Sequence, residues 1–289
     1  MKICVTSGQH NESKYAAEWV AWYLLQGVDK FVVYNHESTD NTREVYEQLA
    51  KHYNIDLYDI FGNNCHYPMQ QHFVDTYRPD YDWLMCHVDP DEFMWAPDGR
   101  TVREVLQGYQ HITQSALGVY WTFFGSNGHV TDPDEPTIKA YTRRGPLDHM
   151  LNHHMKSIVR GNGKGGVMYV TNPHVYTTEF GTIDLEGRPI QPHQGLNKDN
   201  PNSTSIMRIN HYWARSEEWF EKVKVPRGYR WDRPATDPSS NVSREFWESQ
   251  NLNDEEDTGI WDLWGERFME KLAEVKENLG DVKPNLFGL

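Results

Sequence analysis

The first third of the chain alternates between short apolar runs typical of β-strands and longer runs with helical spacing. Aromatic residues recur at helical spacing over about Ser13–Gln26, and Gly27 stands where the glycine after a helix belongs. Strands that alternate with helices assemble as βαβ units around a mostly parallel sheet. The sequence therefore predicts an α/β fold, with early strands over Lys2–Thr6, Lys30–Tyr34, Ile55–Ile60 and Trp83–Val88.

The rest of the chain carries less regular patterns. Residues 181–205 are rich in Gly, Pro and Asn, which predicts a long surface loop. No linker clearly divides the chain, so we expect one domain over residues 1–289. Further strands are expected over Leu117–Phe124 and Ile206–Tyr212, and helices from the capping residue Thr101 and over Gly259–Leu279.

The charge balance argues against a nucleic-acid partner. The formal net charge is −14 at pH 7, and the sequence contains no obvious stripe of Lys and Arg that would follow a phosphate backbone. A small anionic ligand would still bind where a metal ion or a helix N-terminus reverses the local field.

Cysteine usage and the N-terminal residues bear on the compartment. The three cysteines, Cys4, Cys65 and Cys86, have no pairing or zinc-like spacing, which predicts free thiols in a reducing environment. The N-terminal residues lack the apolar segment of a signal peptide, and no run approaches the roughly 20 apolar residues of a membrane span. We therefore expect a soluble, cytoplasmic protein without a membrane span.

Two carboxylates directly follow the apolar run that ends at Val88. Of three Asp-x-Asp triplets, only Asp89-Pro90-Asp91 directly follows a nearly continuous apolar run, as expected of a central strand covered on both faces. Open α/β sheets bind ligands at the carboxyl ends of their strands, and residues i and i+2 of an extended segment point to the same side. Such oxygen ligands suit Mg²⁺ or Mn²⁺, which bind diphosphates. A solvated acidic turn is the alternative.

Short motifs around these carboxylates occur in a characteristic order over roughly residues 1 to 275. They resemble the GT-A-type transferases of glycosyltransferase family 92 and its family 2-like bacterial and viral relatives. The family usually has a small aliphatic residue in place of Pro90, and often a lysine in place of Arg215. The motifs include Asn11-Glu12, Glu18-Trp19-Val20, Ser38-Thr39-Asp40, Asp89-Pro90-Asp91-Glu92-Phe93, Trp121–Ser126, Lys156–Arg160, Asn172-Pro173-His174 and His211-Tyr212.

The resemblance implies how the chain is organised. It implies a GT-A-type, Rossmann-like nucleotide-sugar-binding domain with a mostly parallel central sheet and a C-terminal helical extension. Residues 1–95 would form the nucleotide-sugar-binding half and residues 96–230 the acceptor-side half. Residues 231–289 would form the C-terminal helical region.

The resemblance also implies roles for single residues. Asp89 and Asp91 would bind Mn²⁺ or Mg²⁺ with His211 as third ligand, and the alternative for His211 is a hydrogen-bonded histidine at a strand end. Asp40 would contact the base or ribose of the nucleotide, unless it only caps the following helix. The remaining donor-side residues are Thr6, Ser7, Glu12 and, as cations for the diphosphate, Lys156, Arg160 and Arg215, with Lys222 and Arg227 as further candidates.

Acceptor-side residues are less well determined. Asp148 and Glu179 are the candidate general bases, because an inverting transfer needs a group that takes the proton of the acceptor hydroxyl. The aromatic residues Trp121, Phe123 and Phe124 are candidates for stacking on a sugar. For the histidines at 149, 153 and 154 we expect structural or surface roles, because no zincin-like glutamate follows His149.

Three functions are compatible with these residues. The first is a metal-dependent glycosyltransferase that moves a sugar from UDP-galactose, UDP-glucose or UDP-xylose to a glycan hydroxyl with inversion. The second is a metal-dependent phosphohydrolase that uses the same two aspartates. The third is a noncatalytic carbohydrate-binding module that relies on the aromatic residues.

Overall fold

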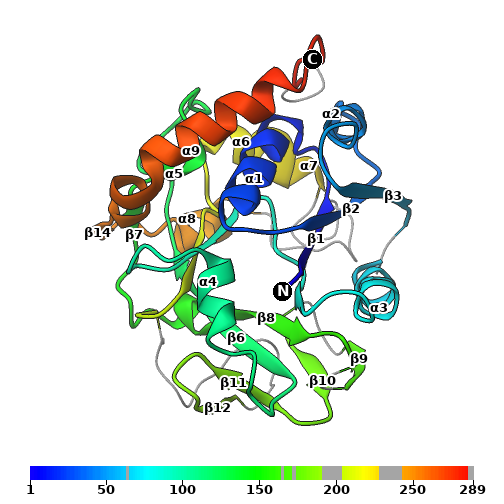
Figure 1. Ribbon diagram of the computed structural model, residues 1–289. Helices are drawn as coiled ribbons and strands as arrows, with labels where there is room; N and C mark the ends of the chain where they lie inside the picture. Colours follow the sequence, from blue (N-terminus) through cyan, green and yellow to red (C-terminus); the bar gives the residue numbers. More distant parts are fainter. Residues whose placement is uncertain (63–64, 164–165, 171–173, 191–203, 228–242, 286–289) are drawn as a thin grey trace.

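The N-terminal third forms an all-parallel sheet in the order β4-β1-β2-β3 (Figure 1). The structure is a computed structural model that describes residues 1–62, 65–163, 166–170, 174–190, 204–227 and 243–285. All four predicted strands are confirmed, although β4 ends three residues before Val88. Their bounds are β1 Ile3–Gln9, β2 Lys30–His36, β3 Ile55–Ile60 and β4 Trp83–Met85.

Helices cover both faces of this sheet. Successive residues of a strand point to opposite faces, so Val5 of β1 packs with α1 and α2 while Cys4 packs with α3. This double cover explains why the strands are apolar at almost every position. The predicted helix after β1 is confirmed, and Gly27 follows it with φ +87°. The three helices are α1 Ser13–Leu25, α2 Thr42–Leu49 and α3 His66–Tyr77.

The second half of the chain extends the same sheet. Among the described residues the sheet has ten strands, with β12-β11-β6-β8 continuing from β4, and β13 pairing with both β5 and β6. The α/β class with a mostly parallel sheet is confirmed, and β8 runs antiparallel to both neighbours. These strands are β5 Glu92–Trp95, β6 Ala116–Phe123, β8 Met155–Arg160, β11 Thr182–Asp184, β12 Pro189–Ile190 and β13 Arg208–His211.

The stretch predicted as a long loop is partly regular. Residues 181–205 contain β11, which pairs in parallel with β6, and β12, which pairs with β11. The loop prediction is therefore wrong for these two short strands, and residues 191–203 lie outside the described part. The short strands escaped notice because two or three residues give no readable periodicity.

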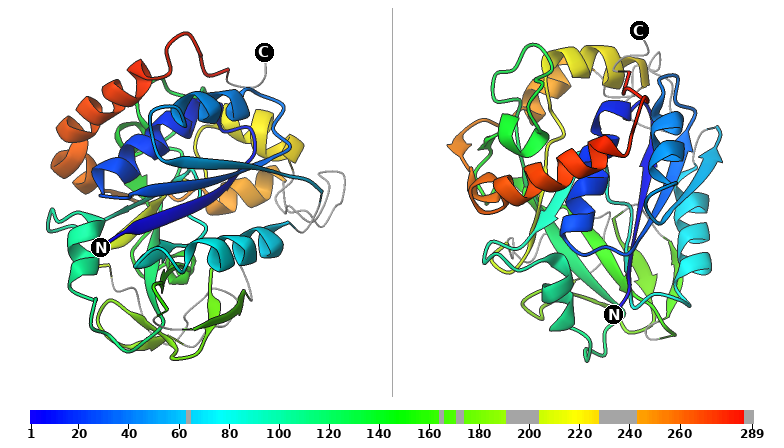
Figure 2. Two further views of the ribbon diagram at one scale, coloured as in Figure 1. Left: turned by 45° about the vertical axis from the view of Figure 1, so that its right-hand side comes forward. Right: turned by 45° about the horizontal axis from the view of Figure 1, so that its top comes forward.

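A long C-terminal helix, α9 Gly259–Glu277, lies across α1 on the outside of the sheet (Figures 1 and 2). Both the terminal helix and the capping box of Thr101 with Glu104 are confirmed. No finding tests the boundaries expected at 95 and 230. The remaining elements are α4 Val102–Gln107, α5 Thr137–Ala140, β7 Arg143–Arg144, η1 Met150–His153, β9 Val167–Val170, β10 Tyr176–Thr178, α6 Glu217–Trp219, the π-helix η2 Phe220–Lys224, α7 Val225–Arg227, α8 Arg244–Gln250 and β14 Glu255–Glu256.

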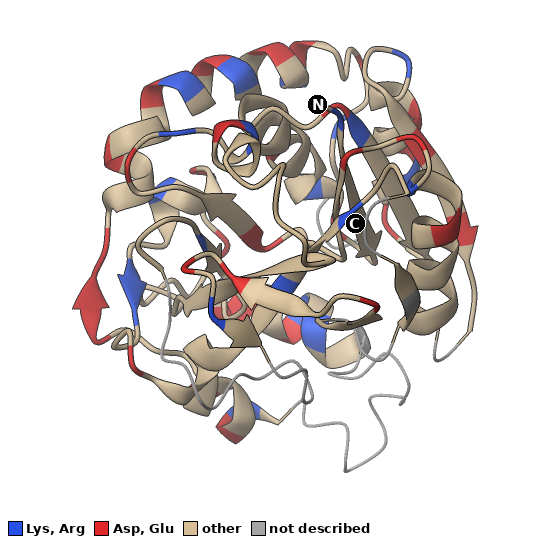
Figure 3. Ribbon diagram, turned by 60° about the horizontal axis from the view of Figure 1, so that its bottom comes forward, with Lys and Arg blue, Asp and Glu red and all other residues tan. Residues whose placement is uncertain are grey.

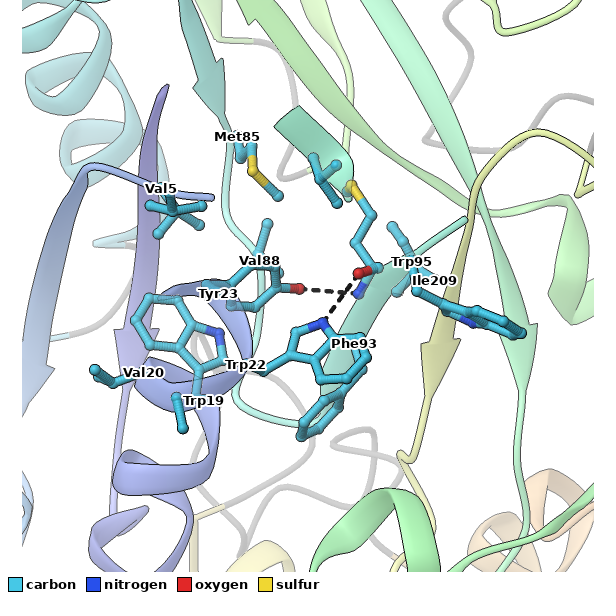
Figure 4. Packing of buried hydrophobic residues seen from close by; sticks show 14 of the residues in the cluster. Val5, Trp19, Val20, Trp22, Tyr23, Met85, Val88, Phe93, Trp95 and Ile209 are labelled. Carbon is cyan, nitrogen blue, oxygen red and sulfur yellow. Dashed lines mark hydrogen bonds between the residues drawn. The ribbon is translucent and has the colours of Figure 1, made fainter. Parts of the chain in front are cut away.

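The largest core cluster of the described residues joins α1 to the strands β1, β4, β5 and β13 (Figure 4), and it includes residues of α9. The Trp22 indole N–H donates to the carbonyl of Met94 at 2.9 Å, and the Tyr23 hydroxyl donates to the carbonyl of Glu92 at 2.8 Å. The Trp22 ring also contacts Trp264 and Phe268 edge-on. The start of β5, directly after the acidic turn, is therefore fixed by two side chains of α1.

The structure also bears on the predictions for the cysteines, the charged residues and membrane spans. Cys4, Cys65 and Cys86 are buried free thiols, as expected. Lys and Arg are interspersed with Asp and Glu over the described ribbon (Figure 3). Among the described residues, no helix is both long enough and apolar enough to cross a bilayer. A cytoplasmic location stays a prediction.

We predict that Trp22→Ala lowers the free energy of unfolding by about 3–5 kcal/mol, because it removes a fully buried indole and leaves a cavity between α1, β5 and α9. Denaturant unfolding of the purified variant measures this loss. Leu263→Ala is the control, because Leu263 lies on α9 with 44% of its surface exposed. Equal losses for the two variants would contradict the packing described here.

Candidate active site

A cavity of about 260 Å³ opens at the carboxyl ends of β1 and β4. It lies between the acidic turn on one side and β6, β8 and β13 on the other. Ligand sites of open α/β sheets lie at this edge. The lining residues are Gly8, Glu12, His66, His87, Asp89, Pro90, Asp91, Trp121, Phe123, Leu151, His154, Lys156, His174, His211, Trp213, Lys224 and Gln250.

The acidic turn that connects β4 to β5 is closed by its own hydrogen bonds. The backbone N–H of Asp89 donates to the Glu92 carboxylate at 2.9 Å, and the backbone N–H of Glu92 donates to the carbonyl of Asp89 at 3.0 Å. Pro90 fixes one φ angle inside the turn. Both Asp89 and Asp91 line the cavity, as the sequence predicted.

A buried lysine holds this turn from the adjacent strand β8. The ammonium of Lys156 donates to Asp89 Oδ2 at 2.8 Å and to the carbonyl of His87 at 2.7 Å, and lies 3.4 Å from Glu92. Burial alone raises the pKa of Asp89, but Lys156 and His87 together hold that pKa below its usual range. Burial raises the pKa of Glu92 well above its usual range. Asp89 is therefore ionised at neutral pH.

His87 occupies an unusual backbone conformation just before the turn. Its φ is +52°, in the left-handed region that a residue with a Cβ rarely adopts. Its Nε2 lies 3.3 Å from Asp89 Oδ1, and burial lowers its pKa to about 4. Strained residues of this kind cluster at functional sites, because the surrounding structure must hold them in place.

Strand β13 brings His211 next to Asp91. His211 pairs with Glu92 of β5 and with Phe123 of β6 in the sheet, which places its Nε2 3.5 Å from Asp91 Oδ1. Burial by itself raises the pKa of Asp91, yet His211 and Lys224 hold it below its usual range. Asp91 is therefore ionised at neutral pH as well.

This pair offers an oxygen and a nitrogen to a divalent cation. His211 Nδ1 is buried without a hydrogen-bond partner among the described residues, and Nε2 faces Asp91. Asp89 offers less, because its Oδ2 is bonded to Lys156. In the described part of the chain, no three His, Cys, Asp or Glu side chains gather closely enough to enclose a metal ion. Asp91 and His211 fit Mn²⁺ or Mg²⁺, with Asp89 as a neighbour that Lys156 would have to release.

Glu12 and Arg215 form a buried pair beside the cavity. Arg215 donates from Nη1 to Glu12 at 2.8 Å, and its guanidinium lies 3.6 Å from the centre of the Tyr15 ring. Glu12 lines the cavity, but Arg215 is fully buried and does not. The prediction that Arg215 contacts the diphosphate is therefore not supported, because its charge is used inside the protein to orient Glu12.

Other predicted donor-side residues lie outside the cavity lining. Thr6 and Ser7 are buried within β1, and the Thr6 hydroxyl donates to the carbonyl of Val32. Asp40 accepts from the backbone N–H groups of Thr42 and Ser13, the first residues of α2 and α1, so its carboxylate is engaged within the protein, although the N-cap residue of α2 is Asn41. The expected contact of Arg160 with the diphosphate does not fit the structure. Arg160 pairs with Trp83 at the amino end of β4, at the end of the strand away from the cavity, and its Nη2 donates to the carbonyl of Gln110.

Neither candidate base reaches the cavity. Asp148 is exposed in the segment before η1, and Glu179 is exposed just after β10. Neither lines the cavity, so this assignment is corrected. It rested on chain order alone, and chain order does not report which strand ends meet.

The sequence predictions omitted some residues of the cavity lining and named Lys222 where Lys224 lines the cavity. Lys224 of η2, rather than Lys222, lines the cavity, with its ammonium 3.9 Å from Asp91 Oδ2 and 3.8 Å from the centre of the Trp213 ring. The position of each lysine relative to the apolar residues of this segment could have distinguished them, because Lys224 is buried and Lys222 is exposed. The side chain of Arg227 lies outside the described part.

The aromatic and histidine residues of the second half converge on the cavity. Trp121 and Phe123 line it as expected, whereas Phe124 is buried in the core. His154, expected to be structural or at the surface, stacks on Trp121 with ring centres 4.9 Å apart and also lines the cavity. His174 meets Trp121 edge-on. Asn172 and Pro173 of the same motif lie outside the described residues.

A family model decides what kind of protein has this site. The model described as "Glycosyltransferase family 92" matches residues 1–248. The chain belongs to glycosyltransferase family 92. This membership confirms the resemblance and, at the level of the family, the expected class of enzyme.

Two curated family 92 proteins that this chain matches come from plants. A glycosyltransferase family 92 protein of Oryza sativa subsp. japonica is 26% identical over 164 residues, which cover 55% of this chain and 26% of that protein. One of Ricinus communis is 22% identical over 291 residues, which cover 95% of this chain and 49% of that protein. The chain thus spans at most about half the length of these relatives.

Solved structures are more distant. Staphylococcus aureus TarS 1–349 in complex with UDP has a TM-score of 0.37 at 16% identity, over 55% of this chain and 47% of that one. A putative glucose-1-phosphate thymidylyltransferase of Bacillus anthracis has a TM-score of 0.29 at 9% identity, over 100% and 98% of the two chains. Scores this low carry no argument about this family 92 site.

The histidines of this site give a testable pH dependence. Burial holds the pKa of His174 well below 6.5, so between pH 7.5 and 5.5 the unfolded chain binds a proton here that the folded chain does not. This residue therefore makes the folded state less stable as the pH falls, by about 1.3 kcal/mol over that interval. We predict that His174→Gln loses correspondingly less stability than the wild type, measured by urea unfolding in EDTA.

The exposed histidine His52 provides the control. The variant His52→Gln should follow the wild-type pH profile. If His174→Gln also ran parallel to the wild type, His174 would not be held neutral by the fold.

Proposed function

We propose that this chain is a metal-dependent glycosyltransferase that moves a sugar from a UDP donor, such as UDP-galactose, UDP-glucose or UDP-xylose, to a glycan hydroxyl with inversion. One observation carries the proposal: the acidic turn and His211 face the same cavity at the carboxyl ends of β1 and β4. Family membership supplies the reaction class.

The charges around the cavity suit a diphosphate bound with a divalent cation. Asp91 and His211 would hold Mn²⁺ or Mg²⁺, which when bound would neutralise the charge that develops on the departing diphosphate. The ammonium of Lys224 lies near Asp91 Oδ2, whereas His211 lies near Oδ1, and Lys224 would contact the phosphate oxygens directly. Lys156 keeps Asp89 ionised and fixed in the turn. The groups that bind the diphosphate and compensate its charge would thus come from the acidic turn, β8, β13 and η2.

The aromatic part of the cavity suits a sugar. Phe123 and Trp213 line it and face each other with ring centres 6.2 Å apart. Aromatic rings pack well against the C–H faces of sugars and exclude water from the reacting atoms. We assign the sugar to this side and the nucleotide to the side of Gly8 and His66.

The two other functions make different predictions at the same site. A phosphohydrolase would cleave the diphosphate rapidly without any acceptor. A noncatalytic carbohydrate-binding module would bind glycans without nucleotide or metal. Family membership and the acidic turn favour transfer, and the experiments below distinguish the three.

We predict that UDP stabilises the protein in Mn²⁺ but not in EDTA. A ligand present at 100 times its dissociation constant adds about 2.7 kcal/mol, which corresponds to roughly 5 °C in the melting temperature of a chain of this size. Asp91→Asn should abolish the Mn²⁺-dependent part of this shift, since it removes the charged oxygen ligand beside His211. A thermal-shift assay with UDP measures both effects.

Asp80→Asn is a matched control, because Asp80 begins another Asp-x-Asp triplet and is exposed. This variant should keep the full shift. A shift that is equal in Mn²⁺ and EDTA would contradict metal dependence, and an unchanged shift in Asp91→Asn would contradict the metal assignment.

Neighbouring lysines test the diphosphate contact. We predict that Lys224→Gln weakens UDP binding in Mn²⁺ by about 10-fold or more, because a hydrogen bond between two charged groups contributes about 1.5–3 kcal/mol. Lys222→Gln should bind UDP like the wild type, since Lys222 is exposed and paired with Glu218. Isothermal titration calorimetry measures both affinities. Equal weakening in the two variants would rule out a specific contact by Lys224.

A further inference from the structure

The inverting transfer proposed above needs a group that accepts the proton of the acceptor hydroxyl. Among the described residues that line the cavity, the carboxylates are Glu12, Asp89 and Asp91. Glu12 is bonded to Arg215, and Asp89 to Lys156. Asp91 faces His211 and is the candidate metal ligand. These three described carboxylates are therefore already engaged, so we examine the described imidazoles of the lining as proton acceptors.

Most of the cavity's imidazoles belong to the acidic turn or the metal site. His87 directs its Nε2 toward Asp89, and the ring of His66 packs against His87 with centres 5.0 Å apart. His211 directs its Nε2 toward Asp91. These three rings lie on the side of the nucleotide and the metal. His154 and His174 remain, and both lie beside Trp121 on the acceptor side.

The tautomer of His154 is fixed by its backbone. Its Nδ1 lies 2.9 Å from the carbonyl oxygen of Leu151, which can only accept, so Nδ1 carries the proton and Nε2 carries the lone pair. Nε2 makes no hydrogen bond to any residue that the structure describes. The ring is held flat against Trp121, with centres 4.9 Å and planes 24° apart.

His154 also lies near the proposed metal ligand. The Trp121 indole that stacks on His154 lies 4.2 Å from the ring of His211, centre to centre. One indole therefore separates the proposed metal ligand from His154. Trp121 is also followed by Phe123 and Trp213, which we assign to the sugar: successive ring centres are 6.2 Å apart.

We propose that Nε2 of His154 is the general base of the transfer, which rests on the proposed function. Nε2 takes the proton of the acceptor hydroxyl while the hydroxyl oxygen forms a bond to the anomeric carbon. The bond between that carbon and the diphosphate oxygen breaks, and its electron pair leaves with UDP. His154 becomes an imidazolium and then gives its proton to water, which restores the base.

The surroundings keep His154 neutral before the reaction. Burial lowers the pKa of His154, and the nearby His211, His153 and Lys156 lower it further, while the hydrogen bond to Leu151 opposes this shift. The pKa of His174 is held well below its usual value, which makes His174 the weaker proton acceptor of the two.

The test compares UDP binding with UDP release. His154→Asn retains a side-chain amide that donates to the carbonyl of Leu151 but has no lone pair at the position of Nε2. UDP release from UDP-galactose, UDP-glucose and UDP-xylose is measured in Mn²⁺, with water or methyl glycosides as acceptors. We expect His154→Asn to release UDP at least 100-fold more slowly than the wild type and to keep its Mn²⁺-dependent thermal shift with UDP.

Added imidazole provides a readout that a structural role would not give. His154→Gly leaves space for imidazole, which should restore UDP release at least 10-fold. His52→Gln is the control, because His52 is exposed and does not line the cavity, and it should release UDP at the wild-type rate.

Three outcomes would overturn the proposal: UDP release by His154→Asn within about threefold of the wild type, no rescue of His154→Gly, or a loss in His174→Gln that His154→Asn does not share. Failure of the proposed function has a different signature. In that case the wild type itself would show no Mn²⁺-dependent shift with UDP and no release, and the role of His154 would fall with it.

Discussion

The ammonium of Lys156 is the contact on which the geometry of the site depends. It lies in a buried position where it meets the carbonyl of His87 and the carboxylates of Asp89 and Glu92. A buried carboxylate without a cation would become protonated or move to water. Because Lys156 comes from β8, the charge of the acidic turn is set by an antiparallel strand inserted between β4 and β6. The site therefore forms only when the two halves of the sheet are joined.

This dependence explains which parts were predictable from the sequence. The early strands, α1 and the acidic turn follow from local periodicity, and the double cover of the sheet made the run before Asp89 stand out. The placement of β8 beside β4 is a long-range pairing with no local signal. Lys156 was nevertheless assigned to the donor side through the family resemblance, whereas Arg160, four residues later on the same strand, was placed at the wrong edge. Lys156 and Arg160 lie near opposite ends of β8, and a short sequence motif does not show which end of a strand faces the cavity.

Arg215 illustrates a second limit of sequence reasoning. A cation that follows His211 closely suggested a contact with phosphate, but the chain turns sharply at Arg215, where φ is +43°. The side chain is directed inward to Glu12, Tyr15 and Trp219. A buried guanidinium needs such partners, since its charge cannot be removed at physiological pH. The cation that lines the cavity after His211 is instead Lys224 of η2, to which we assign the contact with phosphate.

Helix α9 extends beyond the segment that defines the family. The family match ends at residue 248, yet α9 begins at Gly259 and lies across α1, where Trp264 and Phe268 meet Trp22. The same indole of Trp22 bonds to Met94 in β5, directly after the acidic turn. The segment matched by the family model is thus shorter than the unit that packs together. A recombinant fragment of this chain cut at residue 248 would leave α1 with an uncovered aromatic face, so a recombinant version of this protein should keep α9.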